Sequence, residues 1–268
     1  MKRINQLLRS WETWIFVITA FLLLVAAPCA LSQFRLNLLG KFLTYAILAL
    51  GIDLIWGYAG ILSLGHGVYF GLGAYSMAMY LKLEASGGQL PDFMSWSGLT
   101  ELPWFWKPFQ HAWFALPMTI ILPVALSMIL GFLTFRNRIK GVYFSILSQA
   151  LAIIFVTLFI GQQPYTGGTN GLTSYSTIFG LPLSSPRIQL ALYIITVLVL
   201  GLAFIFCRRL TGARFGRIIM AIRDGENRVR FTGYDPAVYK LMVYAISGAL
   251  AGIAGALFVT QVGIISRP

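Results

Sequence analysis

The sequence has 268 residues, of which 58% are hydrophobic and 10% are charged, and its mean hydropathy is +0.78. This balance excludes an ordinary soluble domain and indicates an integral protein of the lipid bilayer. The net charge of +12 would suggest a nucleic-acid partner in a soluble chain. Here the basic residues lie between apolar segments, so membrane topology explains them and no nucleic-acid partner is expected. The two cysteines, Cys29 and Cys207, offer neither a disulfide framework nor a metal-ligand spacing.

Seven apolar runs predict an all-α fold, a polytopic transmembrane helical bundle that forms a single domain over residues 1–268. A helix rises about 1.5 Å per residue, so runs of this length can cross the hydrocarbon core. The first run is interpreted as a retained span, although the motif AAPCA leaves a signal peptide as the alternative. The expected spans are Trp14–Leu31, Phe42–Trp56, Leu62–Leu81, Trp113–Phe135, Val142–Ile160, Ile188–Phe206 and Leu241–Val262.

The basic residues predict the orientation, because short cytoplasmic loops are enriched in lysine and arginine. Alternating spans with a cytoplasmic N-terminus place most of the basic residues inside. The inner set is Lys2, Arg3, Arg9, Arg136, Arg138, Lys140, Arg208, Arg209, Arg214, Arg217, Arg223, Arg228, Arg230 and Lys240, and the outer set is Arg35, Lys41, Lys82, Lys107, Arg187 and Arg267. A re-entrant third run would put the loop RNRIKG and the N-terminus on opposite sides, which the charges disfavour.

The third run is the most informative, because it is apolar and yet rich in glycine. Glycines at positions 57, 60, 65, 67, 71 and 73 weaken an uninterrupted helix. A broken helix survives at membrane depth only where protein or a water-filled cavity surrounds it, so the run predicts a pathway for a solute. The candidate pathway residues are Asp53, Gly57, Gly60, Ser63, Gly65, His66 and Gly67. Alternatively, Gly67 and Gly71 form a GxxxG motif that serves only close helix packing.

Asp53 is the only acidic residue inside an expected span, and a carboxylate in lipid is costly unless it faces a cavity or a partner. It would form a hydrogen-bonded pair with His66 if the chain folds back between Gly57 and Gly60. The alternative is that Asp53 lies hydrated at the cytoplasmic interface or caps the next segment. A proton relay has no support, since no second intramembrane acid exists.

Two segments are expected on the outer side, one rich in aromatic residues and one that carries almost no charge. The segment between the third and fourth spans contains Trp96, Trp104, Trp106 and Trp113, which favour anchoring at the membrane interface over docking of an outer partner. Residues 161–187 carry almost no charge and offer neutral hydrogen-bonding groups. They suit a small neutral solute, although a plain solvated loop has the same residue types.

The inner segment 207–240 predicts an amphipathic helix. Phe215, Ile218, Ile219 and Ile222 recur at helical spacing, with Thr211 as the expected N-cap. Gly225 should interrupt this helix, Gly233 should end a second turn, and Asp235-Pro236 should begin the last span. Such a helix favours insertion into a groove of a partner protein. Adsorption to anionic lipid is the alternative, against which the acidic residues Asp224 and Glu226 argue.

Several motifs occur together in one order: GYAGILSLGHGVYFGLGAY, then GRIIMAIRDGENRVRFTGYDPAVYK, then SGALAGIAGAL. Over about Asn37 to Pro268 the chain resembles the permeases of branched-chain amino acid type ABC importers. The motifs DLIWGYAGILSLGHG, FRNRIKGVYFSILSQAL, GGTNGLT and RFTGYDP resemble more narrowly the urea transporter permease subunits of type C. The resemblance implies a bacterial inner-membrane permease with a second permease subunit, two cytoplasmic ATP-binding subunits and an external solute-binding protein.

The resemblance also assigns roles to residues. Residues 216–233 correspond to the loop that couples such permeases to their ATPases, and the expected coupling residues are Gly216, Arg217, Ala221, Arg223, Asp224, Glu226 and Gly233. Amino-acid transporters usually have Asn at the position of Asp53, so Asp53 and Trp56 favour urea or a short amide. Members of the family continue with further spans beyond the end of this sequence, so a fragment or a truncated product is expected.

The sequence predicts no enzyme and no bound cofactor, since ATP would be used by the partner subunits. No P-loop pattern GxxxxGK[ST] occurs, and residues 60–65 exceed the spacing of a hydrolase elbow by one residue. The alternatives for function are a branched-chain amino acid permease, a self-sufficient urea channel or secondary carrier, and a remnant that transports nothing.

Overall fold

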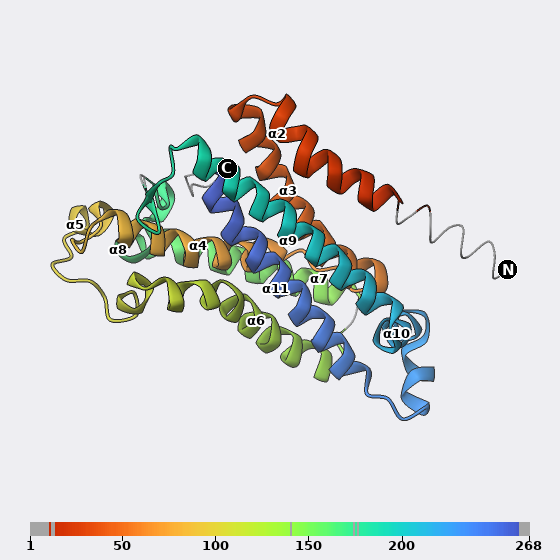
Figure 1. Ribbon diagram of the computed structural model, residues 1–268. Helices are drawn as coiled ribbons and strands as arrows, with labels where there is room; N and C mark the ends of the chain where they lie inside the picture. Colours follow the sequence, from red (N-terminus) through yellow and green to blue (C-terminus); the bar gives the residue numbers. More distant parts are fainter. Residues whose placement is uncertain (1–10, 12–13, 140, 174, 176, 263–268) are drawn as a thin grey trace.

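The computed structural model describes residues 11, 14–139, 141–173, 175 and 177–262 (Figure 1). Apolar side chains at helical spacing make almost every element a helix. The elements are η1 (Leu22–Ala26), α2 (Ala27–Ala30), α3 (Gln33–Asp53), η2 (Leu54–Tyr58), α4 (His66–Ala85), α5 (Asp92–Trp96), η3 (Lys107–Gln110), α6 (Ala112–Arg136), α7 (Val142–Gly161), α8 (Gln163–Thr166), η4 (Gly168–Asn170), β1 (Thr177–Ile178), β2 (Leu181–Pro182), α9 (Pro186–Gly212), α10 (Arg214–Phe231) and α11 (Pro236–Val262). The two short strands pair antiparallel, and the all-α prediction is confirmed.

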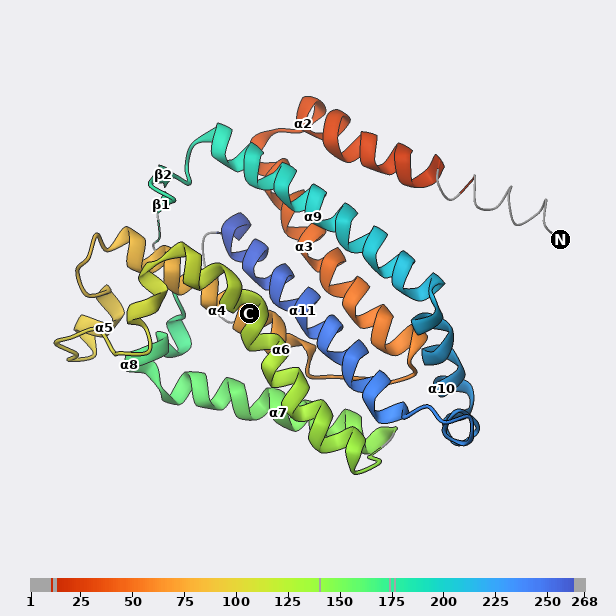
Figure 2. The ribbon, with the colours of Figure 1, turned by 60° about the horizontal axis from the view of Figure 1, so that its bottom comes forward.

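The bundle is built around α11, which packs against α3, α4 and α6, while α9 covers the other side of α3. In Figure 2, α7 lies on the side of α4 that faces away from α11. Among the described helices, five are long and apolar enough to cross a membrane: the α3–η2 helix (Gln33–Tyr58), α6, α7, α9 and α11. Of these, α11 has the most buried apolar window (56%) and α7 the least (17%). The chain is therefore a polytopic helical membrane protein with α11 as its central helix.

The remaining two expected spans correspond to a shorter apolar helix, Trp14–Ala30, and to α4. α4 has 20 residues but begins at His66, four residues later than expected, because the preceding residues are not helical. Two other helices, α3 and α9, are longer than expected. α3 begins nine residues before the expected start, at Gln33, and α9 continues to Gly212. Thr211 is consequently inside α9, where its hydroxyl donates to the carbonyl of Cys207 at 2.9 Å, and the expectation that it caps the next helix is wrong.

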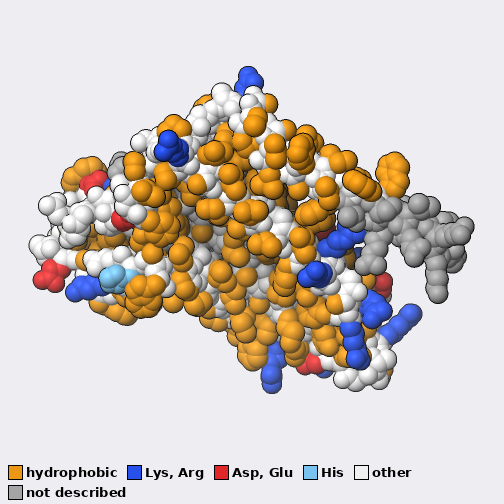
Figure 3. Space-filling view, viewed as in Figure 1, with side chains coloured by type: hydrophobic (Ala, Val, Ile, Leu, Met, Phe, Trp, Pro, Cys, Tyr) orange, Lys and Arg blue, Asp and Glu red, His pale blue; other side chains and the backbone are white. Residues whose placement is uncertain are grey.

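The elements divide between two ends of the bundle (Figure 1). The α10 end carries the start of the first helix, the end of α3, the turn after α6 and the start of α11. The α5 end carries the segment 86–111 and the segment 161–185. Figure 3 shows basic side chains gathered over the α10 end, which agrees with the expected division of charge. The expected basic residues Lys2, Arg3, Arg9, Lys140 and Arg267 lie outside the described residues.

Glycines allow the closest helix contacts, but not at the GxxxG pair. A Cβ atom on Gly73 would overlap the backbone of Gly252 in α11, and one on Gly255 would overlap the carbonyl of Phe70 in α4. By contrast, no described atom lies within 4 Å of a Cβ built on Gly67 or Gly71. Within the described chain, the packing interpretation of this GxxxG motif is therefore wrong.

Candidate functional site

The glycine-rich run contains an interruption of the helix, as the sequence predicts. α3 passes at Asp53 into the π-helical turn η2, which ends at Tyr58. The chain then turns at Gly60, whose φ of +69° lies in the left-handed region that favours glycine. Residues 59–65, which we call the break, are not helical, and α4 begins directly after them.

Side chains of α7 satisfy the backbone of the break. The Leu64 N–H donates to Ser148 Oγ at 3.0 Å, and Ser145 Oγ donates to the carbonyl of Leu62 at 2.8 Å. The Ile61 N–H donates back to the carbonyl of Ile55 at 3.0 Å. Lipid offers no hydrogen-bond partners, so irregular backbone at membrane depth needs such protein groups. These backbone groups of the break are therefore bonded within the protein, while the side chains of Leu62 and Leu64 are exposed.

The start of α4 is fixed by a buried polar cluster. His66 Nε2 and Ser247 Oγ are 2.6 Å apart, and Ser247 Oγ donates to the carbonyl of Gly51 at 2.6 Å. Next to them the hydroxyls of Tyr69 and Tyr244 are 2.6 Å apart, and all four side chains are buried. Because Ser247 lies near the middle of α11, this cluster joins α3, α4 and α11 deep in the bundle.

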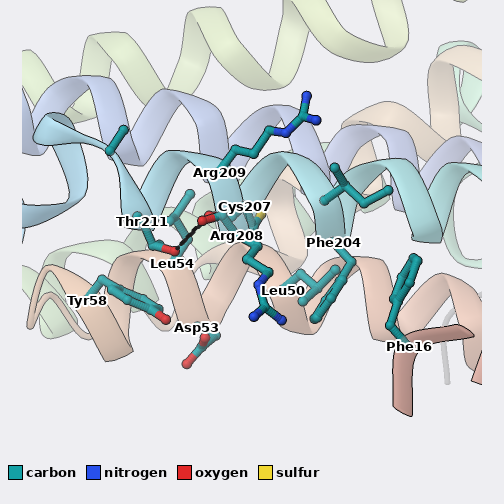
Figure 4. Close-up of a pocket in the computed structure, with 13 residues that line it drawn as sticks. Phe16, Leu50, Asp53, Leu54, Tyr58, Phe204, Cys207, Arg208, Arg209 and Thr211 are labelled. Carbon is teal, nitrogen blue, oxygen red and sulfur yellow. Dashed lines mark hydrogen bonds between the residues drawn. The ribbon is translucent and has the colours of Figure 1, made fainter. Parts of the chain in front are cut away.

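The conditional prediction of an Asp53–His66 pair is wrong, because His66 bonds Ser247 instead. Asp53 is exposed and lines a groove of about 910 Å³ between α3 and α9. Its carboxylate folds over Gly57, where a Cβ atom would overlap it. Figure 4 shows the carboxylate pointing to the open side of this groove, near the side chains of Tyr58 and Arg208. The hydrated alternative for Asp53 is therefore the one that the structure favours.

Three expected pathway residues, Ser63, Gly65 and His66, are buried. Ser63 is 8% exposed, and neither its hydroxyl nor His66 Nδ1 has a hydrogen-bond partner of normal geometry in the described part of the chain. A Cβ on Gly65 would lie 2.5 Å from the carbonyl oxygen of Ser148, so this glycine permits close contact with α7. In this conformation, these three positions belong to the packed interior.

The structure brings the break and the expected coupling segment into direct contact. Arg223 Nη1 donates to the carbonyl of Gly57 at 2.6 Å. A Cβ built on Gly60 would lie 2.7 Å from Arg223 Cγ, so the arginine stem lies directly over the turn. Arg223 Nε also donates to Asp224 Oδ1 at 3.0 Å. A side chain of α10 thus binds the end of the α3–η2 helix two residues before the break begins.

The apolar face of α10 is buried against the chain itself. Ile219 and Ile222 belong to the same apolar cluster as Leu54, Ile55 and Ile61. The expectation that this apolar stripe inserts into a groove of another protein is therefore wrong, because its own chain covers it. The exposed coupling candidates are Arg217, Ala221, Arg223, Asp224 and Gly233. A partner at this end would therefore meet mainly polar residues of α10, together with the exposed side chain of Phe231.

The rest of α10 is arranged as the sequence predicts, with an interruption and a defined end. Gly225 has non-helical angles inside the element, and Gly233, with φ of +86°, follows its last turn. Glu226 accepts from Lys240 Nζ of α11 at 2.8 Å and from Arg230 at 3.5 Å. Gly216 packs on the backbone of Thr211, where a Cβ would overlap. These contacts fix both halves of α10 to the bundle.

A second groove, of about 320 Å³, lies between α4 and α7. Gly67 and Gly71 form part of its wall, which explains why a side chain would meet nothing there. Its other lining is mainly apolar: Val68, Leu72, Tyr75, Ala152, Phe155, Val156, Phe159 and Ile160, with Gly168, Thr169 and Gly171 from the segment after α7. Of the expected neutral hydrogen-bonding groups in residues 161–187, Thr169 is the one in this lining.

The serines that bond the break, and the serine and tyrosines of the buried cluster at the start of α4, were not among the sequence candidates. Ser145, Ser148 and Ser247 each carry a hydroxyl into an otherwise apolar helix, and this is the signal that could have found them. Nothing local in the sequence indicates which backbone groups they serve. In the described part, no three His, Cys, Asp or Glu side chains come together as metal ligands would.

Comparisons with known proteins match most of the chain. The family described as branched-chain amino acid transport system / permease component matches residues 34–267. The high-affinity branched-chain amino acid transport system permease protein LivM of Escherichia coli is 27% identical over 274 residues, covering 94% of this chain and 58% of that protein. The probable branched-chain amino acid transport permease protein LivM of Methanocaldococcus jannaschii is 25% identical over 226 residues, covering 80% and 64%.

A shorter match links residues of this chain to a protein with a different solute in its name. The fructose import permease protein FruF of Bifidobacterium longum is 34% identical over 100 residues, 37% of this chain and 23% of that protein. The chain spans little more than half the length of the LivM protein of Escherichia coli. No solved structure matches it significantly.

Proposed function

Because this chain belongs to the family of permease components of branched-chain amino acid transport systems, we propose that it is a membrane-spanning permease subunit of an ATP-driven importer of the bacterial inner membrane. The proposed partners are a second permease subunit, two cytoplasmic ATP-binding subunits and an external solute-binding protein. The proposed N-terminus is cytoplasmic, and the partner subunits hydrolyse the ATP. The multiple apolar helices and the names of the LivM relatives support this proposal.

The contact between Arg223 and Gly57 is the observation that carries the proposed mechanism. ATP binding would close the partner subunits on the exposed polar face of α10. Since the apolar face of α10 is packed on Leu54 and Ile55, a displacement of α10 would move the end of the α3–η2 helix with it. Movement of packed elements about a few loop residues is an established form of domain motion.

The break is the part of the proposed pathway that would change shape. Its backbone is held to α7 by two serine hydroxyls, while the residues on either side are helical. A tilt transmitted through Gly57 would therefore concentrate its dihedral changes in residues 59–65. The resulting shift of α4 against α7 would open and close the groove between them, which is alternating access around a broken helix.

Urea or a short amide is the first candidate solute, supported by the urea-type motifs that include Asp53 and Trp56. The described lining of the groove between α4 and α7 carries no charged side chain, and urea needs donors and acceptors but no counter-ion. A branched-chain amino acid is the second candidate. The names of the LivM relatives favour it, and the apolar lining of the same groove would stabilise an aliphatic side chain at about 25 cal/mol per Å² buried.

Uptake by the assembled complex in liposomes tests the proposal and separates the two solutes. Labelled urea and labelled leucine would each be supplied with the solute-binding protein outside and ATP inside. We expect ATP-dependent uptake of one of them, abolished when the ATP-binding subunits are omitted. Uptake by this chain alone, without ATPases, would contradict the proposal and show a self-sufficient channel or carrier.

A further inference from the structure

The cavity that contains Asp53 adjoins a second, apolar cavity along the bundle. The first part, of about 910 Å³, lies at the α10 end between α3 and α9. The second part, of about 520 Å³, runs between the first helix (Trp14–Ala30), α3 and α9. The two parts share Phe16, Leu50, Phe204 and Arg208. They therefore adjoin at these four residues as a polar mouth and an apolar corridor, which together we call the groove.

Among the described residues that line the mouth, Asp53 is acidic and Arg208 and Arg209 are basic. Figure 4 shows the Asp53 carboxylate and the Arg208 guanidinium on facing helices, both directed to the open side, whereas Arg209 points away from them. A guanidinium has five N–H donors, so Arg208 can serve a phosphate while keeping other interactions. A carboxylate is the natural partner of an ammonium group. The mouth is thus complementary to a headgroup that carries both a phosphate and an amine.

The apolar lining of the corridor suits a hydrocarbon chain. The lining consists of apolar side chains from the first helix, α3 and α9, together with Gly201, and its polar members are Thr19 and Arg208. The corridor is bounded by helices that are long or apolar enough to lie in a membrane. In a bilayer such an apolar groove is open to acyl chains, and the basic and acidic groups lie at the end where headgroups would be.

We propose that this groove binds a diacyl phospholipid with an amine-bearing headgroup, whose phosphate contacts Arg208, whose ammonium contacts Asp53 and whose acyl chain occupies the corridor. The lipid would join the first helix to α3 and α9. Phe16 and Phe204 stack with ring centroids 5.3 Å apart at the junction of mouth and corridor, so the lipid would lie across this aromatic pair. The site is separate from the break and does not depend on which solute is transported.

Lipid titration of the purified, delipidated 268-residue chain tests the site, with adducts counted by native mass spectrometry. The probes are phosphatidylethanolamine, phosphatidylglycerol and diacylglycerol with identical acyl chains. We expect phosphatidylethanolamine to bind most tightly and diacylglycerol most weakly. Arg208→Gln should weaken phosphatidylethanolamine binding by about tenfold, as expected for loss of a hydrogen bond to a charged group. Asp53→Asn should remove the preference for phosphatidylethanolamine over phosphatidylglycerol.

Two further variants keep the test decisive. Arg217→Gln removes the same charge from an exposed residue that lines neither part of the groove and should leave binding unchanged. Gly201→Leu adds a side chain that meets no described atom within 4 Å of its Cβ, so it should fold normally, fill the corridor and weaken all lipids that have acyl chains. Equal binding of the three probes, equal effects of the two arginine variants, or full binding by Gly201→Leu would overturn the proposal. Tighter binding of phosphatidylglycerol would overturn the choice of headgroup.

Discussion

Replacing Arg223 with glutamine should separate ATP hydrolysis from solute uptake. The change removes the hydrogen bond of 2.6 Å to the carbonyl of Gly57 but keeps a residue with good helix propensity. Hydrogen bonds that involve a charged group contribute about 1.5–3 kcal/mol. Because the Arg223 side chain is 42% exposed, we expect the lower figure, about 1.5 kcal/mol, which corresponds to about a tenfold change in an equilibrium.

The assay measures uptake and ATP hydrolysis in the same proteoliposomes that contain the assembled complex. In Arg223→Gln we expect uptake per ATP hydrolysed to fall by about tenfold, while the ATP-binding subunits still co-purify. Arg228→Gln is the matched control, because it removes an exposed arginine from the same element. Wild-type uptake in Arg223→Gln, or an equal loss in both variants, would refute the role of the Gly57 contact.

Three other predictions follow from particular contacts. Ser148→Ala leaves the Leu64 N–H without its partner, so the free energy of unfolding should fall by about 1–3 kcal/mol. Thermal unfolding in detergent measures this loss, and an unchanged unfolding temperature would contradict the account of the break. Gly71→Leu should block uptake without lowering the unfolding temperature, since nothing described lies within 4 Å of its Cβ, and normal uptake would remove the α4–α7 groove from the pathway. The hydrogen bond from Lys82 lowers the pKa of Asp92 below its usual 3.8. The stabilising effect of the Lys82–Asp92 ion pair is therefore complete above pH 3.8 and is lost as the pH falls through the lowered pKa of Asp92. Proteolysis of segment 86–111 should increase on acidification, and Asp92→Asn should abolish that dependence; equal pH profiles would contradict it.

The sequence predicts the helices and the position of the break because both depend on local composition. Apolar runs fix the helices, and the concentration of glycines marks where one of them fails. The kink at Gly225 and the cap at Asp235, which accepts from the Ala237 N–H at 3.0 Å, are also local and were predicted correctly.

What the sequence does not reveal depends on contacts between distant segments. The assignment of the apolar face of α10 to a partner failed because periodicity shows that a face is buried but not what buries it. The pairing of His66 with Ser247, which is 181 residues away in the chain, required the three-dimensional fold. In the same way, the GxxxG motif identifies small residues, while the groove beside Gly67 becomes visible only when α7 is in place.

The most direct test of the central claim is a pair of distances measured by pulsed electron paramagnetic resonance in the assembled complex, with and without ATP. Cys29 and Cys207 would first be replaced by serine, and spin labels attached at exposed positions. The mechanism predicts that the distance between Ala221→Cys in α10 and Trp56→Cys in η2 stays constant, whereas the distance between Trp56→Cys and Val142→Cys in α7 changes. A change in the first distance with the second fixed would show that α10 moves without the broken helix and would contradict the account.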